Sequence, residues 1–160
     1  MRLPNFGYHL ARLKGGTLRA TYQAVLPLIA PRRVKSPRSL ALDVFAYSNE
    51  QMLPEQIRSI RSFLRYVGRP KSFTIISDGS HTERSIRLLQ KVDPLVSVRE
   101  SSKGLPADLP PKFRQYITSY VMAKQLGLLM TLPTNGRSLY IDADVRFFHG
   151  ARDFEHYLAR

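Results

Sequence analysis

The chain has 160 residues, of which 43% are hydrophobic. This length and composition fit one domain with a buried core and exclude a wholly disordered protein. Cysteine is absent, which excludes disulfides, zinc–thiolate sites and thiol nucleophiles. No apolar run approaches the ~20 residues that cross a bilayer, and the short run 24–30 is interrupted by Pro27. We therefore expect a cytoplasmic protein with neither a membrane anchor nor a signal peptide.

The charge is strongly positive and unevenly distributed. Lys and Arg number 25 against 12 Asp and Glu, a formal net charge of +13, and no acidic residue precedes Asp43. Residues 1–38 are expected to form a basic leader with a short helix around 18–28, ending in the segment 31–37 with its two prolines. Such a leader can contact an anionic membrane, nucleic acid or a polyanionic substrate, or it can be a solvated face of the domain.

Strand and helix patterns alternate after the leader. A buried strand is predicted at 40–47, and the helix that follows has Pro54 in its first turn and is stopped by Gly68. Its apolar residues recur at a spacing of 3.6. Three arginines fall on its other faces, where we expect them to be solvated: Arg58, Arg61 and Arg65.

The order of the remaining elements predicts the fold class. A strand at 72–76 is followed by a helix that begins with a capping box of Ser80 and Glu83, and then by a strand at 95–98. A polar loop at 100–111 leads to a helix at 112–132. A turn at 134–136 then connects this helix to a last strand. This alternation predicts parallel strands with right-handed crossovers. We therefore expect a layered α/β/α sandwich with a mostly parallel sheet, formed by residues 39–160.

Polar residues follow three of the predicted strands. Ligands of such sheets bind beyond the carboxyl ends of the strands. Tyr47, Ser48 and Asn49 end the first strand, and Asp78 follows the second. Together with the aspartates of the last strand, these residues are expected to face one cleft and to bind substrate.

Two aspartates in the segment 138–148 give the strongest signal. Asp142 and Asp144 are separated by one small residue at the end of an apolar run. Side chains two apart on a strand share a face, so their carboxylates would converge and repel each other unless a cation lay between them. A hard divalent cation, Mg²⁺ or Mn²⁺, takes such oxygens and often a substrate phosphate as well. The segment therefore predicts a metal–diphosphate site.

Three further residues have two interpretations each. Lys124 lies on an apolar helical stripe, where it either extends to solvent or contacts a diphosphate or carboxylate. Asp78 either hydrogen-bonds a base or ribose or closes a turn. His149 is either an additional metal ligand or a surface histidine.

The segment 138–148 resembles the Asp-x-Asp motif of glycosyltransferases with the GT-A fold, here Asp142-Ala143-Asp144. The helix that carries Lys124 and the strand end at 75–80 are also similar to the donor-binding half of that fold. The resemblance implies a Rossmann-like α/β sandwich that binds a nucleotide-diphosphate sugar, often UDP-linked, with Mn²⁺ or Mg²⁺. It further implies that Asp142 contacts the ribose and that both aspartates contact the metal-bridged diphosphate, for transfer of the sugar to an unknown acceptor.

The same resemblance implies that part of the enzyme is missing. In that fold the acceptor site, the catalytic base of inverting members and a late metal ligand follow the motif, whereas sixteen residues follow Asp144. We therefore expect a fragment that contains the donor half, and we assign no catalytic base.

Two other functions remain open. An Asp-x-Asp at a strand end also resembles haloacid-dehalogenase-type phosphatases, but those carry Thr or Val at the position of Arg146. The second is a non-enzymatic basic module that binds a polyanion such as nucleic acid, although no recognition pattern for nucleic acid is present. The sequence contains no P-loop, G-x-G-x-x-G or G-x-S-x-G motif.

Overall fold

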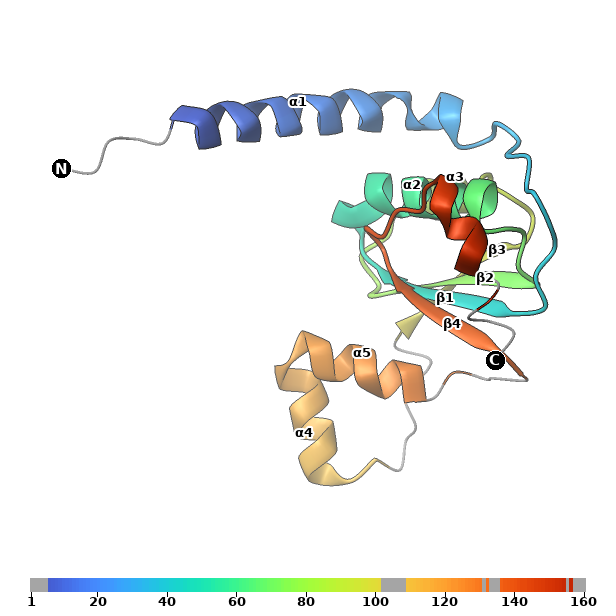
Figure 1. Cartoon of the computed structure of the whole chain (residues 1–160). Helices are drawn as coiled ribbons and strands as arrows, with labels where there is room; N and C mark the ends of the chain where they lie inside the picture. The colour runs from blue at the N-terminus through green and yellow to red at the C-terminus, as the bar shows by residue number, and fades with distance from the viewer. Residues whose placement is uncertain (1–5, 102–108, 131, 133–135, 155, 157–160) are drawn as a thin grey trace.

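The computed structural model describes residues 6–101, 109–130, 132, 136–154 and 156. Figure 1 shows the course of the chain. Its elements are, in order, α1 (Phe6–Ile29), β1 (Asp43–Ser48), the 3-10 turn η1 (Glu50–Met52), α2 (Leu53–Tyr66), β2 (Ser72–Ser77), α3 (Glu83–Gln90), β3 (Val96–Glu100), α4 (Pro111–Ser119), α5 (Val121–Met130), β4 (Ser138–Asp142) and the 3-10 turn η3 (His149–Asp153).

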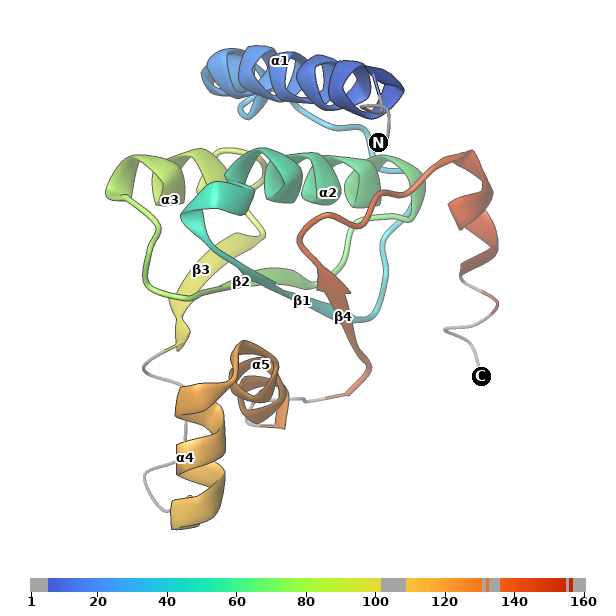
Figure 2. The same ribbon diagram turned by 90° about the vertical axis from the view of Figure 1, so that its left-hand side faces the viewer.

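The four strands form one parallel sheet in the order β3-β2-β1-β4. Helices α1, α2 and α3 lie on one side of this sheet, and the α4–α5 pair lies on the other (Figures 1 and 2). The strand alternation explains this layering, because Val44 and Ala46 of β1 are buried toward α2 whereas Phe45 and Tyr47 point to the opposite face. The prediction of an α/β sandwich with a parallel sheet is confirmed.

Helix α2 supplies most of the core on its side of the sheet. Pro54 occupies its first turn, and its apolar residues, among them Ile57, Ile60 and Phe63, are completely buried. The ring of Phe63 meets that of Phe73 of β2 edge-on, with 5.8 Å between centroids. The helix ends before Gly68, whose φ of 151° and contact with Arg38 O, only 2.9 Å from where a Cβ would lie, both require glycine.

The basic leader folds differently from the prediction. In place of a short helix, α1 runs for 24 residues and contains Pro27. Most of its side chains are exposed, but Leu26 in its last turn and Ala30 just after it belong to the hydrophobic core. Arg19 pairs with Glu55 of α2 at 2.6 Å. Packing of this end against α2 therefore stabilises a helix that glycine and proline within the sequence argue against.

Two other predicted elements also differ. The helix expected at 112–132 is two helices, because Tyr120 adopts extended angles (φ −130°, ψ 123°) between α4 and α5. The cap of α3 is Thr82, whose Oγ1 accepts from Ser85 N at 3.2 Å, whereas Ser80 hydrogen-bonds Asp78. The sequence could not distinguish these neighbouring hydroxyls, since both precede the helix.

Parts of two predicted loops lie outside the described residues, namely 102–108 of the polar loop and 133–135 of the turn before β4. Gly136, which ends that turn, has a φ of 129°. Among the described helices, none combines the length and apolar composition needed to cross a bilayer.

Candidate functional site

The strand order creates a switch point between β1 and β4. From β1 the chain crosses to β2 and β3 on one side, and it then returns to place β4 on the other side of β1. Helices leave the sheet in opposite directions at such a point, which opens a crevice at the carboxyl ends of the strands. Tyr47 near the end of β1 pairs in register with Asp142 at the end of β4. The predicted aspartate motif thus begins at the switch point.

The two aspartates do not lie on one continuous strand. β4 ends at Asp142, and Ala143 and Asp144 form a turn in which Val145 N donates to Asp142 O at 3.2 Å. The expectation that strand alternation places both carboxylates on one face is therefore wrong, because pairing with β1 stops at Tyr47. Both aspartates are exposed, and the Ala143 between them is buried.

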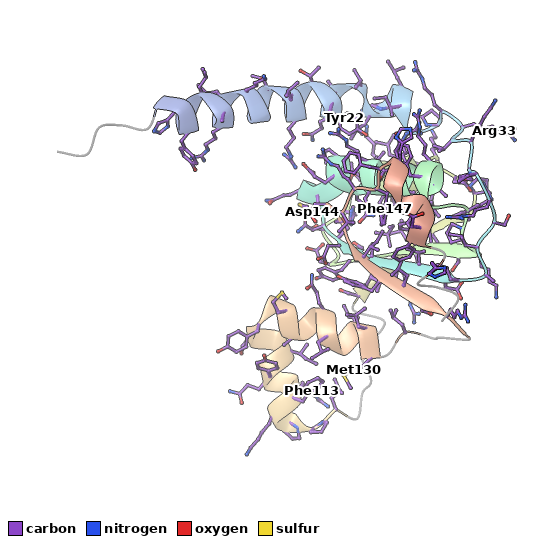
Figure 3. All side chains as sticks on the ribbon, in the orientation of Figure 1. Tyr22, Arg33, Phe113, Met130, Asp144 and Phe147 are labelled. Atoms are coloured by element: carbon purple, nitrogen blue, oxygen red, sulfur yellow. The ribbon has the colours of Figure 1, made fainter. Side chains whose placement is uncertain are left out.

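Asp144 lies on the α2 side of the sheet, as Figure 3 shows, with Phe113 and Met130 of the α4–α5 pair on the other side. It lines a cavity together with residues of α1, η1 and α2, including Arg19 and Gln23 of α1 and Glu55 of α2. Glu55 is already paired with Arg19. Within the described part of the chain, neither Asp142 nor Asp144 has an ion-pair partner, so no described cationic side chain neutralises these carboxylates.

Tyr47 and Tyr140 lie on the same face of the sheet as Asp142. Tyr140 precedes Asp142 by two positions on β4, and Tyr47 is the register partner of Asp142. Burial, and after it the nearby charge of Asp142, raises the pKa of Tyr140 to about 12. Its buried hydroxyl has no partner at normal hydrogen-bond geometry within the described residues. The sequence analysis did not single out Tyr140. It lies two residues before Asp142 on the predicted strand, however, and side chains two apart on a strand share a face.

Ser48 and Asn49 have structural roles in the fold. Ser48 is 2% exposed and lies on the α2 face of β1, opposite to Tyr47. The Asn49 side chain caps η1 by accepting from Met52 N at 3.0 Å. Of the three substrate-binding residues predicted at the end of β1, only Tyr47 lies on the face of Asp142.

Asp78 and its neighbours form a hydrogen-bonded turn after β2. Asp78 Oδ1 accepts from both Ser80 N and Ser80 Oγ, at 2.8 and 2.6 Å. Glu50 connects η1 to this turn, because its carboxylate accepts from Thr82 N at 3.0 Å and from Ser85 Oγ at 2.7 Å. Asp78 therefore closes a turn, and the network holds the loop after β1 against the loop after β2.

Next to this turn, Ser77 Oγ lies 2.8 Å from His81 Nδ1, in a buried pair. His81 Nε2 is buried without a partner within the described residues. Burial lowers the pKa of His81, and the nearby charges of Glu50 and Asp78 counteract this only in part. His81 is thus a neutral, structural histidine at pH 7.

The remaining predicted residues are Lys124 and His149. Lys124 is a residue of α5, and its side chain lies outside the described part of the structure. His149 is exposed, and its ring lies 4.8 Å from that of Tyr66 of α2. The described residues contain no group of three or more His, Asp and Glu side chains arranged to hold a metal ion. A metal at Asp142 and Asp144 would therefore need ligand oxygens from water or substrate.

Comparisons with protein-family models, with curated proteins and with solved structures found no significant match.

Proposed function

We propose that this chain binds the nucleotide-diphosphate sugar of a metal-dependent glycosyltransferase with the GT-A fold. The observation that carries the proposal is the position of the turn Asp142-Ala143-Asp144 at the switch point of a parallel sheet, beside Tyr47. Sheets of this kind bind nucleotides at that point. The proposal extends to a UDP-linked donor, to Mn²⁺ or Mg²⁺ as the cation and to an unknown acceptor.

Asp142 and Asp144 each offer carboxylate oxygens to a hard divalent cation, but from different sides of the sheet (Figure 3), so the cation would need further ligands from water or substrate. Asp142 and Asp144 are exposed carboxylates without an ion-pair partner among the described residues, and carboxylate oxygens are the ligands that Mn²⁺ and Mg²⁺ prefer. When bound, the cation would act as a Lewis acid that neutralises charge on the departing nucleoside diphosphate.

The chain's own residues would orient the donor. The Tyr47 ring would pack against the base or ribose, and Tyr140, whose hydroxyl is buried near Asp142, would help to orient that carboxylate. The network of Glu50, Asp78 and Ser80 would hold the loops that border the crevice.

The proposal is tested by the dependence of nucleotide binding on metal. We expect UDP, or another nucleoside diphosphate of a panel, to raise the Tm with Mn²⁺ and to have little effect with EDTA. At a concentration ~100 times Kd, the stabilisation would be ~2.7 kcal/mol, which corresponds to roughly 5–11 °C for a domain of this size. Equal shifts with Mn²⁺ and EDTA, or no shift with any nucleotide, would contradict the proposal.

Asp144→Asn is the most informative variant in this experiment. Because Asp144 is exposed and makes no ion pair with a described residue, the substitution should change the free energy of unfolding without ligand by no more than ~0.5 kcal/mol. It should nevertheless abolish the Mn²⁺-dependent shift. Asp153→Asn removes another exposed carboxylate, in η3, and is the matched control. If both variants behave alike, the aspartate turn is not the metal site.

A further inference from the structure

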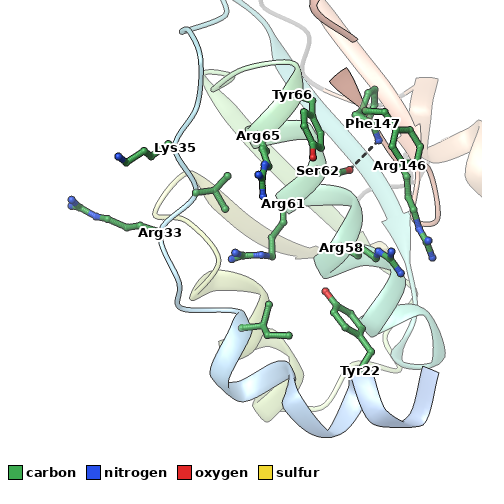
Figure 4. A pocket seen from close by; sticks show the side chains of 13 residues that line it. Tyr22, Arg33, Lys35, Arg58, Arg61, Ser62, Arg65, Tyr66, Arg146 and Phe147 are labelled. Carbon is green, nitrogen blue, oxygen red and sulfur yellow. Dashed lines mark hydrogen bonds between the residues drawn. The ribbon is translucent and has the colours of Figure 1, made fainter. Parts of the chain in front are cut away.

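A second cavity, of about 670 Å³, lies between α1, α2 and the segment that follows the aspartate turn. Figure 4 shows its lining side chains. The cationic ones come from three parts of the chain: Arg33 and Lys35 from the connection after α1, Arg58, Arg61 and Arg65 from α2, and Arg146 from the segment after β4. The spacing of the three α2 arginines places them on one side of that helix. Arg58 and Arg65 are exposed, as predicted, and Arg61 is partly buried.

No acidic residue among the described residues that line this cavity balances its positive charge. Six cationic side chains line it, and no carboxylate among the described residues does. Glu55, whose charge acts on Tyr22 in the cavity wall, is already paired with Arg19 at 2.6 Å. Burial lowers the pKa of Arg61, and the positive charges of Arg32 and Arg65 lower it further. Like charges held this close destabilise the fold unless an anion neutralises them.

The cavity walls are held in place by specific contacts. Arg61 Nη1 donates to the Arg32 carbonyl at 2.7 Å and thereby fixes the connection after α1 to α2. Ser62 Oγ accepts from Phe147 N at 3.1 Å, the interaction dashed in Figure 4, and this bond fixes the third wall. Arg58 lies over the Tyr22 ring, with 5.8 Å to the centroid. These contacts hold the walls of the cavity, and its cationic side chains, all exposed except the partly buried Arg61, are accessible to a ligand from solvent.

We propose that this cavity binds a phosphate group with at least two negative charges. Guanidinium groups offer pairs of N–H donors that match phosphate oxygens, and several of them can share one phosphate or diphosphate. Ile29, Val34 and Phe147 also line the cavity and provide apolar contact for the organic part of a phosphate ester. The ligand is either a soluble phosphate ester or the headgroup of a membrane phospholipid, since both present the same chemistry.

The proposal is independent of the donor site. None of Tyr47, Tyr140, Asp142 and Asp144 lines the cavity. The predicted ligand also needs no metal, because arginine and lysine supply the positive charge. Binding measured in EDTA therefore reports on the cavity alone, and its failure would leave the proposed donor site untouched.

The first experiment measures binding of inorganic pyrophosphate by calorimetry in EDTA at 150 mM salt. Arg58→Gln/Arg65→Gln should weaken binding at least about tenfold, because two of the six cavity cations are removed. Arg84→Gln/Arg99→Gln is the control: it removes the same charge from two exposed arginines outside the cavity and should change Kd less than about twofold. Arg61 is not substituted, because its bond to the Arg32 carbonyl supports the fold. Absent binding, or an equal loss in both variants, would overturn the proposal.

The second experiment identifies the source of the phosphate. Vesicles of phosphatidylcholine with and without phosphatidic acid are sedimented with the protein. A lipid headgroup is indicated if the wild type, but not Arg58→Gln/Arg65→Gln, sediments with phosphatidic acid and pyrophosphate displaces it. A soluble ester is indicated if pyrophosphate binds the cavity but the vesicles do not. Retention on RNA that pyrophosphate does not displace, with no pyrophosphate binding, would overturn the phosphate site in favour of a general polyanion surface.

Discussion

Tyr140 shows how the switch point affects single side chains. Its pKa, raised to about 12 by burial and by Asp142, exceeds the value of about 10 for a tyrosine in an unfolded chain. The folded state therefore favours the neutral phenol. This contribution to stability is complete below pH 10 and is lost as the pH rises from 10 to 12.

Replacing Tyr140 with Phe should make this alkaline loss of stability smaller. The free energy of unfolding, measured with urea from pH 8 to 11.5, should fall less steeply in Tyr140→Phe than in the wild type. Part of the fall should remain, because burial also raises the pKa of Tyr22 and Tyr47. Tyr116→Phe, at a tyrosine that is 49% exposed, is the control and should follow the wild type. Parallel curves for Tyr140→Phe and wild type would contradict the effect of burial.

His81 should have the corresponding effect on the acidic side. Burial lowers the pKa of His81, so the unfolded chain, with a histidine pKa near 6.5, binds a proton more readily than the folded one. The contribution to stability is complete above about pH 6.5 and is lost as the pH falls toward the folded-state value. The free energy of unfolding should therefore decrease between pH 7 and 5.

His81→Asn removes the titrating group and keeps a hydrogen-bonding atom near Ser77 Oγ. We expect this variant to lose less stability than the wild type between pH 7 and 5, as measured by urea unfolding at each pH. His9→Asn changes an exposed histidine of α1 and should reproduce the wild-type slope. A His81→Asn curve as steep as that of the wild type would show that other groups cause the acid sensitivity.

At the scale of elements, α1 combines two different parts. Its first turns are exposed, whereas Leu26, 1% exposed, joins the core formed by α2. Leu26→Ala should therefore lower the free energy of unfolding by ~2–5 kcal/mol, as cavity-forming substitutions in cores do. Leu28→Ala, two residues further along the same helix and 67% exposed, should change it by ~0.5 kcal/mol or less. Chemical denaturation measures both, and similar losses would mean that α1 does not pack as described.

The sequence predicted elements well where local signals agreed. Pro54 and Gly68 bounded α2, and the alternation of β1 and β2 placed these strands within a few residues. The sequence did not predict the elements correctly where contacts between distant residues overrode the local helix or strand preference. Gly15, Gly16 and Pro27 argue against a 24-residue helix, yet packing of its last turn supports one. The break at Tyr120 between α4 and α5 has neither glycine nor proline to signal it.

The candidate site was predictable in position but not in detail. Because parallel strands end at one edge, the sequence was sufficient to place Tyr47, Asp78 and Asp142 there. It could not show that β4 stops at Asp142, since the end of a strand depends on its partner. The cationic cavity was not predicted at all, because its arginines come from separate segments that only the folded chain brings together.

For the whole molecule, the strand order also determines when the candidate site can form. β1 pairs with β2 and β2 with β3 through short crossovers, whereas β4 pairs with β1 from the far end of the chain: Asp43 lies opposite Ser138. Contacts between such distant residues form slowly, because closing a long loop costs entropy before pairing compensates for it.

During synthesis the ribosome therefore releases β1, β2 and β3 well before β4. Until β4 emerges, the edge of β1 that it will cover offers unpaired N–H and C=O groups to any other strand nearby, including those of a second nascent chain. Pairing with β4 satisfies these groups of β1 and leaves β4 as the edge strand of the sheet. The same strand brings Asp142 beside Tyr47, so the candidate site is assembled in the step that covers the edge of β1.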